Sequence, residues 1–112
     1  MFITPTDTIP GQRIKVVLGV VFGSCVQTKN FGKDIFAALR SIIGGEAKGY
    51  TEMMEESRRK STERMIQQAE AMGANAIISF RYTTSQTMMG AAEIMAFGTA
   101  VFIEPGDVHG QR

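Results

Sequence analysis

The chain of 112 residues is 44% hydrophobic and 21% charged, which indicates one folded domain and excludes a disordered chain. Its 12 basic and 11 acidic residues give a formal net charge of +1, so neither nucleic acid nor a membrane surface is predicted as a partner. A single cysteine excludes a disulfide framework, and the first residues lack the pattern of a signal peptide, so a cytoplasmic location is expected.

The first third of the chain begins with two predicted strands. Residues 1–12 combine an apolar pair with two prolines, which favours an edge strand or arm followed by a turn. Residues 13–23, RIKVVLGVVFG, are rich in β-branched side chains and predict a strand buried on both faces, or on one face and at a subunit contact. Gly19 inside this strand indicates a bulge or a close backbone approach. Residues 24–33 are predicted to form a connection.

Two helices are predicted next. Apolar residues at helical spacing predict a short helix over residues 34–43, and the Gly-Gly pair that follows ends it. Residues 50–72 predict a long amphipathic helix, with methionines and small residues on one stripe and charges on the opposite face. Ser57 and Ser61 in that stripe are small enough for the helix backbone to approach its neighbour closely. The methionines are interpreted as packing residues.

The charged face of the long helix predicts two ion pairs at i, i+4 spacing, Glu55 with Arg59 and Glu56 with Lys60. Each such pair stabilises an exposed helix by about 0.2–0.5 kcal/mol. Gly73 stands where a glycine in the left-handed conformation commonly ends a helix, so the helix is expected to end there.

The remaining elements predict an antiparallel hairpin. Residues 74–86 and 93–104 have strand patterns, and MMGAA between them, residues 88–92, is the predicted turn. The expected fold class is α+β, with one short and one long helix packed on a small, mostly antiparallel sheet. We expect a single domain over residues 1–104 and a polar C-terminal tail over residues 105–112. Open edges and apolar strands in so small a sheet favour a homo-oligomer.

No motif in the chain predicts catalysis or a metal centre within one subunit. Cys25 follows a strand and the only histidine, His109, lies in the tail, so a Cys–His nucleophile pair is not expected. No group of residues has the spacing of a zinc or transition-metal site. Residues 44–50, GGEAKGY, precede a helix but lack the GKS or GKT ending of a phosphate-binding loop, so they are interpreted as a connector.

The chain contains, in order, the blocks GVVFG (19–23), DIFAALRSIIGGEAKGY (34–50), GANAIISFRY (73–82) and FGTAV (97–101). Together these blocks resemble the YbjQ-like bacterial family, and the resemblance extends over roughly residues 2–103. It implies a β-α-β-β unit of dodecin-like type that assembles into a homopentamer around a β-barrel. The family carries a heavy-metal-binding label, and no catalytic residue comes with the resemblance. Ser57 and Ser61 occupy positions where the family tends to have alanine.

In an oligomer, one residue from each chain forms a ring, so a single methionine or carboxylate per chain is enough to build a metal site. The first hypothesis is therefore a non-enzymatic homo-oligomer that binds a metal ion or a small ligand at subunit interfaces. The metal candidates around the predicted turn are Met88, Met89 and Glu93.

Two other functions stay open from the residues alone. One is an enzyme with an active site between subunits, and the other is an oligomeric scaffold for a protein partner. A deep interface pocket with convergent polar groups favours the enzyme, and a dry interface favours a structural role. The candidates for an inter-subunit ligand site are Arg40, Glu46, Lys48 and Tyr50.

Overall fold

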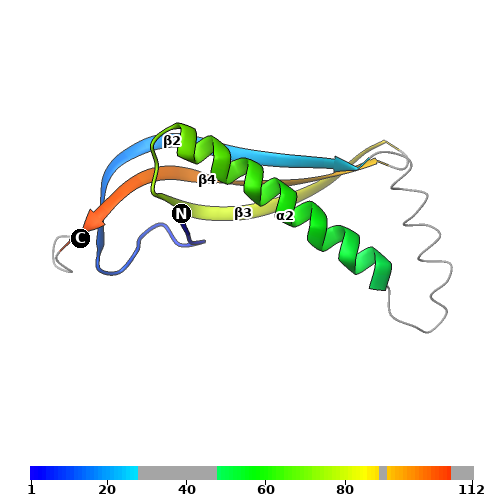
Figure 1. Cartoon of the computed structure of the whole chain (residues 1–112), viewed down its shortest axis with the longest axis horizontal. Helices are drawn as coiled ribbons and strands as arrows, with labels where there is room; N and C mark the ends of the chain where they lie inside the picture. Colours follow the sequence, from blue (N-terminus) through cyan, green and yellow to red (C-terminus); the bar gives the residue numbers. More distant parts are fainter. Residues whose placement is uncertain (28–47, 89–90, 107–112) are drawn as a thin grey trace.

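The computed structural model describes residues 1–27, 48–88 and 91–106 (Figure 1). The predicted short helix over residues 34–43 lies outside the described residues. The described elements in chain order are β1 (Phe2–Ile3), β2 (Gln12–Gln27), α2 (Lys48–Ala71), β3 (Ala76–Met88) and β4 (Ala91–Pro105).

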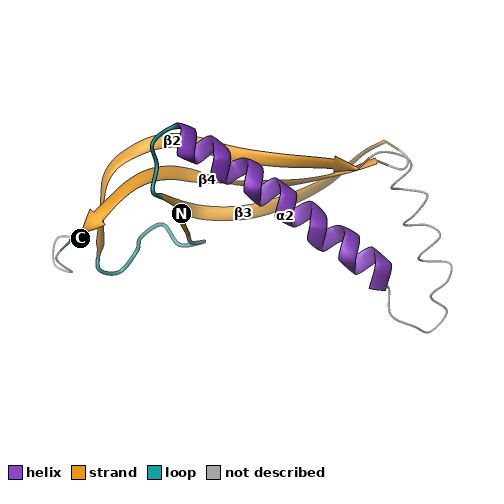
Figure 2. Cartoon of the chain, viewed as in Figure 1, coloured by secondary structure: helices purple, strands orange, loops and turns teal. Residues whose placement is uncertain are grey.

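The strands form one mixed sheet in the order β1-β3-β4-β2. β4 pairs antiparallel with β2 on one side and with β3 on the other, whereas the short β1 pairs parallel with β3. α2 crosses one face of this sheet (Figure 2). The expected α+β class, with a long helix on a small and mostly antiparallel sheet, is therefore confirmed for the described residues.

The strands are longer than the sequence pattern predicted. β2 continues to Gln27, so the prediction of a connection from residue 24 is wrong for residues 24–27. These residues pair with the first part of β4, and this pairing outweighs the weak strand preference of their polar members. Met88 pairs with Ala91, so the hairpin turn is also shorter than the predicted residues 88–92.

Two glycines that interrupt the predicted strands have different roles. Gly19 has a φ of +141° and lies at a shift in the β2–β4 register, which confirms the expected bulge. Gly98 in β4 permits a close approach instead, because a Cβ at this position would lie 2.7 Å from Cγ2 of Ile77.

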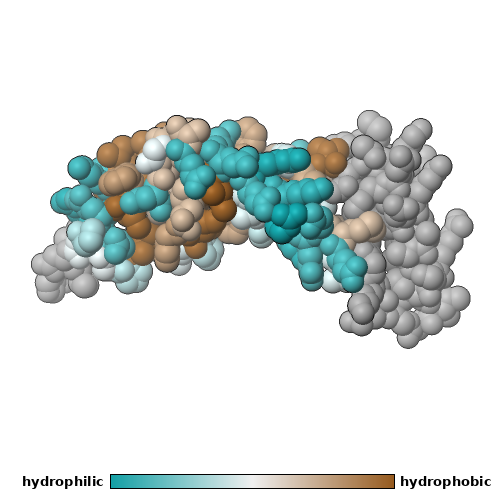
Figure 3. Space-filling model, viewed as in Figure 1, coloured by the Kyte–Doolittle hydropathy of each residue, from teal (hydrophilic) through white to brown (hydrophobic). Residues whose placement is uncertain are grey.

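Charged side chains cover the solvent side of α2, which is hydrophilic in Figure 3. Arg59 forms ion pairs with Glu56 and Glu63, so its partners differ from the predicted Glu55. The hydrogen bonds from Arg59 lower the pKa of Glu56, and the positive charge of Lys60 adds to this effect. In the part of the chain that the structure describes, no helix has the length and apolarity needed to cross a membrane.

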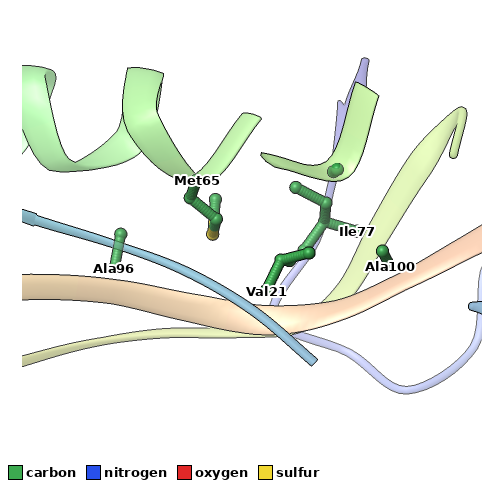
Figure 4. Close-up of a cluster of buried hydrophobic side chains, with 6 residues drawn as sticks. Val21, Met65, Ile77, Ala96 and Ala100 are labelled. Carbon is green, nitrogen blue, oxygen red and sulfur yellow. The ribbon is translucent and has the colours of Figure 1, made fainter. Parts of the chain in front are cut away.

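The main core lies between α2 and the sheet (Figure 4). A smaller core lies on the opposite face, because successive residues of β3 and β4 point to opposite sides. There Ile9, from the N-terminal arm (residues 4–11), covers part of both strands. The buried side chains are Val21, Met65, Ala69, Ile77, Ala96 and Ala100 in the main core, and Ile9, Ala76, Ile78 and Val101 in the smaller one.

α2 and β2 meet at backbone contact. Gly23 of β2 is buried, and a Cβ at this position would overlap the carbonyl oxygen of Ser61 and the amide nitrogen of Met65. Ser57 and Ser61 are both 0% exposed. The Ser61 hydroxyl donates a 2.6 Å hydrogen bond to the carbonyl oxygen of Ser57, one turn back in the helix. The close approach expected at these serines is confirmed at Ser61, and Ser57 is buried in the same stripe.

Gly73 ends α2 as predicted. Its φ is +85°, and its N–H donates a 3.0 Å hydrogen bond to the carbonyl oxygen of Glu70. The side chain of Asn75 then ties the helix exit to β4. Its Nδ2 donates to the carbonyl oxygen of Ile103 at 2.8 Å, and its Oδ1 accepts from the N–H of Ile103 at 2.7 Å. The chain thus passes from helix to sheet within a few residues.

Substitution of Gly23 by alanine tests the contact between α2 and β2. We expect Gly23→Ala to lower the free energy of unfolding by about 3 kcal/mol, because the added methyl group must push the helix off the strand. Urea unfolding followed by circular dichroism measures this loss.

Gly73→Ala is the matched control. An added Cβ there has no atom within 4 Å, so the only cost is that alanine must adopt the left-handed backbone conformation of Gly73. That strain is worth about 1–2 kcal/mol. A Gly23→Ala loss no larger than the control loss would contradict the proposed contact.

Candidate functional site

The sheet face that α2 leaves uncovered is apolar. Val20, Phe22 and Val26 of β2 are 68%, 50% and 56% exposed. They point away from the helix, because Val21 between them lies in the core under α2. Exposure of this much apolar surface is typical of a site that another molecule covers. The surface formed by Val20, Phe22, Val26 and their half-buried β4 neighbours Met95 and Phe97 is named the open face.

β2 is an edge strand, and two side chains of α2 seal the middle of its edge. The Phe22 N–H donates a 2.7 Å hydrogen bond to Oε1 of Gln68. Nη1 of Arg64 donates to the carbonyl oxygen of Ser24. An edge strand otherwise offers such backbone groups to a strand of another chain. The contact at Gly23 brings α2 close enough for both side chains to reach the edge.

The hairpin end of the sheet carries the predicted metal residues. Glu93 is half-buried, and the Ser85 hydroxyl donates a 3.4 Å hydrogen bond to its Oε1 across the strands. Met88 ends β3, whereas its side chain and the whole of Met89 lie outside the described residues. Within residues 1–27, 48–88 and 91–106, no three His, Cys, Asp or Glu side chains form a group able to hold a metal ion.

The predicted ligand-binding residues are not brought together by the described part of the chain. Arg40 and Glu46 lie outside it. Lys48 and Tyr50 lie in the first turn of α2, and their side chains are also outside the description. An inter-subunit ligand site at these residues stays a prediction.

Cys25 is a packed thiol, as expected. It is 4% exposed and pairs with Ile94 on the sheet face under α2. The histidine that a nucleophile pair requires, His109, lies outside the described residues.

Two clefts lie beside the N-terminal arm. In the smaller, of about 510 Å³, the side-chain amide of Asn75 is already bonded to both backbone groups of Ile103. The larger, of about 650 Å³, contains the exposed cation of Arg81 and is named the Arg81 cleft. The Arg81 cleft is lined by Pro5, Thr6, Phe80, Arg81 and Tyr82, and the smaller cleft by Phe2, Ile9, Pro10, Gln12, Asn75, Ile103 and Pro105.

Reasoning from the sequence did not identify Arg64, Gln68 or Arg81. Arg64 and Gln68 have the character of an ordinary solvated helix face, and only the packing at Gly23 directs them to a strand edge. A signal for Arg81 was present, because it is the only charged residue in the strand predicted over residues 74–86.

Comparison with known proteins places the chain among close relatives. The profile of the YbjQ family, described as "Putative heavy-metal-binding", matches residues 1–104. A "UPF0145 protein" of Thermotoga petrophila is 56% identical over 104 residues, which cover 93% of this chain and 98% of the relative. A "UPF0145 protein" of Archaeoglobus fulgidus is 50% identical over 101 residues, with coverages of 90% and 94%.

A solved structure has a similar fold at low sequence identity. It is a protein with unknown function of the DUF74 family from Pediococcus pentosaceus. The match has a TM-score of 0.63 and 16% identity, and it covers 93% of this chain and 98% of the other. At this identity the likeness extends to the fold alone.

The seal on the β2 edge is tested by removing both side chains. We expect Arg64→Ala with Gln68→Ala to lower the free energy of unfolding by about 1–3 kcal/mol, since each net hydrogen bond contributes roughly 0.5–1.5 kcal/mol. The uncovered edge is also expected to promote strand addition and aggregation. Urea unfolding and a thioflavin T time course measure the two effects.

Gln67→Ala is the control, because Gln67 lies on the same helix beside Gln68 and is exposed. A double variant that matches this control in both measurements would show that the two hydrogen bonds do not protect the edge.

Proposed function

We propose that this chain, which belongs to the YbjQ family, is a non-enzymatic, self-assembling protein that holds a metal ion or small ligand between its subunits. The observation that supports this proposal is the exposed apolar surface of the open face. In a single chain, Val20, Phe22 and Val26 each have at least half of their surface exposed. Burial of such side chains is the main driving force of stable association.

The division of the molecule into two surfaces supports assembly with the helices outside. Charged residues cover the solvent side of α2, so this side suits contact with water (Figure 3). The open face lies on the other side of the sheet. A barrel formed from the sheets of several copies, with the open faces inside and the helices outside, buries the apolar surface and leaves the charged one in water.

The edges of the sheet support a ring of copies. On one side the edge is β2, and on the other it is the part of β3 beyond Phe80, because among the described residues β1 and the N-terminal arm form backbone hydrogen bonds with β3 only as far as Phe80. Pairing between two different edges is heterologous, and a heterologous contact closes into a ring when the rotation allows it. The side chains of Gln68 and Arg64 already bind the N–H of Phe22 and the carbonyl oxygen of Ser24. Strand pairing between copies therefore uses the rest of the β2 edge. The resemblance to the YbjQ-like family implies five subunits in this ring.

A charge on the open face tests the assembly. We expect wild-type protein to have a native mass of several times 12.2 kDa and Val20→Asp to have a mass near that of one chain. The reason is that burial of an unpaired carboxylate in an apolar interface is strongly unfavourable. Native mass spectrometry and light scattering measure the mass, and circular dichroism confirms folding.

Val16→Asp is the matched control, because Val16 is also exposed on β2 but lies opposite Phe102, on the helix side of the sheet. A monomeric wild-type protein would contradict the proposal. Equal dissociation by both variants would contradict the assignment of the interface to the open face.

The metal part of the proposal depends on assembly. The described residues of one chain hold no suitable group of three His, Cys, Asp or Glu ligands, so a site needs ligands from several copies. Glu93 points to the same side of β4 as Phe97, because residues two apart share a face. It therefore faces the interior of the proposed barrel, near the hairpin that also contains Met88 and Met89. One carboxylate per subunit then forms a ring, with thioethers available to a soft ion.

Metal analysis of the assembled protein tests this ring. After incubation with Cd²⁺ and desalting, we expect about one ion per ring by mass spectrometry, and at least a tenfold lower content in Glu93→Gln, because the ring loses its negative charge. Glu70→Gln on the exposed side of α2 is the control. Cadmium bound at one ion per chain, or retained equally by both variants, would contradict a shared site.

A further inference from the structure

The Arg81 cleft is built where the N-terminal arm crosses β3. The N–H of Ser79 donates a 2.9 Å hydrogen bond to the carbonyl oxygen of Thr6, and the N–H of Phe80 donates to that of Thr4 at 3.1 Å. These bonds replace strand pairing at the point where β1 has ended. The arm and the strand together therefore form the two sides of the cleft.

A residue with a strained backbone, Ser79, lies where the N-terminal arm bonds to β3. Ser79 has a φ of +55°, and among the described residues it is the only non-glycine residue with a positive φ. The β3–β4 register shifts between Ile78 and Arg81, so Ser79 belongs to a bulge. A bulge changes the direction of the side chains that follow it, and such bulges are frequent beside binding sites. Here the side chains that follow are those of the cleft.

Arg81 is fixed in position but its charge is not neutralised. Nη1 donates hydrogen bonds to the carbonyl oxygens of Pro5 at 2.9 Å and Phe80 at 2.8 Å. The ion pairs among the described residues do not include Arg81, and Asp7, the acidic residue of the arm, does not pair with it. A guanidinium held in this way presents its remaining N–H groups as a fork, which matches a carboxylate or phosphate.

The rest of the cleft is apolar and rigid. The rings of Phe80 and Tyr82 meet edge to face, with centroids 4.8 Å apart and an interplanar angle of 76°. The hydroxyl groups of Tyr82 and Thr62 of α2 are 2.8 Å apart and hydrogen-bonded, which fixes the tyrosine ring. Pro5 of the N-terminal arm also lines the cleft. Such walls suit a flat, apolar group.

We infer that the Arg81 cleft binds a small organic anion with a flat apolar body, its carboxylate or phosphate on Arg81 and its body between Pro5 and the Phe80–Tyr82 rings. The residues that form this site all belong to one chain. The inference therefore does not depend on self-assembly or on the metal ring.

Binding of simple probes to the full-length protein tests the inference. The probes are benzoate and phenyl phosphate, which carry the two kinds of anion, and benzyl alcohol, which carries the same ring without charge. We expect saturable NMR shifts of the Arg81 side-chain N–H and the Tyr82 ring with at least one anion. Benzyl alcohol is expected to bind at least tenfold more weakly. The stronger of the two anions then identifies the head group.

Two variants separate the charge from the geometry of the fork. Arg81→Gln is expected to weaken probe binding at least tenfold, and Arg81→Lys, which keeps the charge and is the safer variant for folding, by a smaller factor. Lys15→Gln is the matched control, because Lys15 is an exposed cation on β2 outside the cleft. Three results would overturn the inference. They are NMR shifts that do not saturate, equal affinity for benzyl alcohol and benzoate, and equal probe affinity in the Arg81 and Lys15 variants.

Discussion

The backbone contact between α2 and β2 at Gly23 sets the position of the other parts of the structure. Because Gly23 in the strand meets the helix backbone at Ser61 and Met65, α2 lies closer to β2 than a larger side chain at this position would permit. At this distance Met65 and Ala69 of α2 pack into the main core. The same distance lets Arg64 and Gln68 reach over the edge of β2. One steric condition therefore determines the core and protects an edge.

A second consequence concerns the surface that the helix does not use. Among the described residues, α2 covers only one face of the sheet, and the N-terminal arm covers only one end of the other face through Ile9. The remainder of that face is the apolar surface of β2 and β4. The described part of the chain thus combines a charged helix surface with an apolar sheet surface. This asymmetry is the basis of the proposed self-assembly.

The sequence predicted the parts of the fold that local patterns determine. The long helix, its end at Gly73, the bulge at Gly19 and the hairpin followed from periodicity and glycine positions, since these depend on neighbouring residues. The extension of β2 to Gln27 and the partners of Arg59 were predicted wrongly, because they depend on pairing and on rotamers. The β2 seal and the Arg81 cleft were missed for the same reason. Each joins segments far apart in the chain, and no single stretch of sequence contains both sides.

The N-terminal arm has a further consequence for the order in which the chain folds. The bond from Arg81 to Pro5 joins residues 76 positions apart, whereas the β3–β4 hairpin and α2 form from neighbouring residues. Closure of so long a loop loses chain entropy before any contact offsets it, and such contacts form slowly. We therefore expect the arm to dock onto a β3–β4 hairpin that already exists and to be among the first parts to detach during local unfolding.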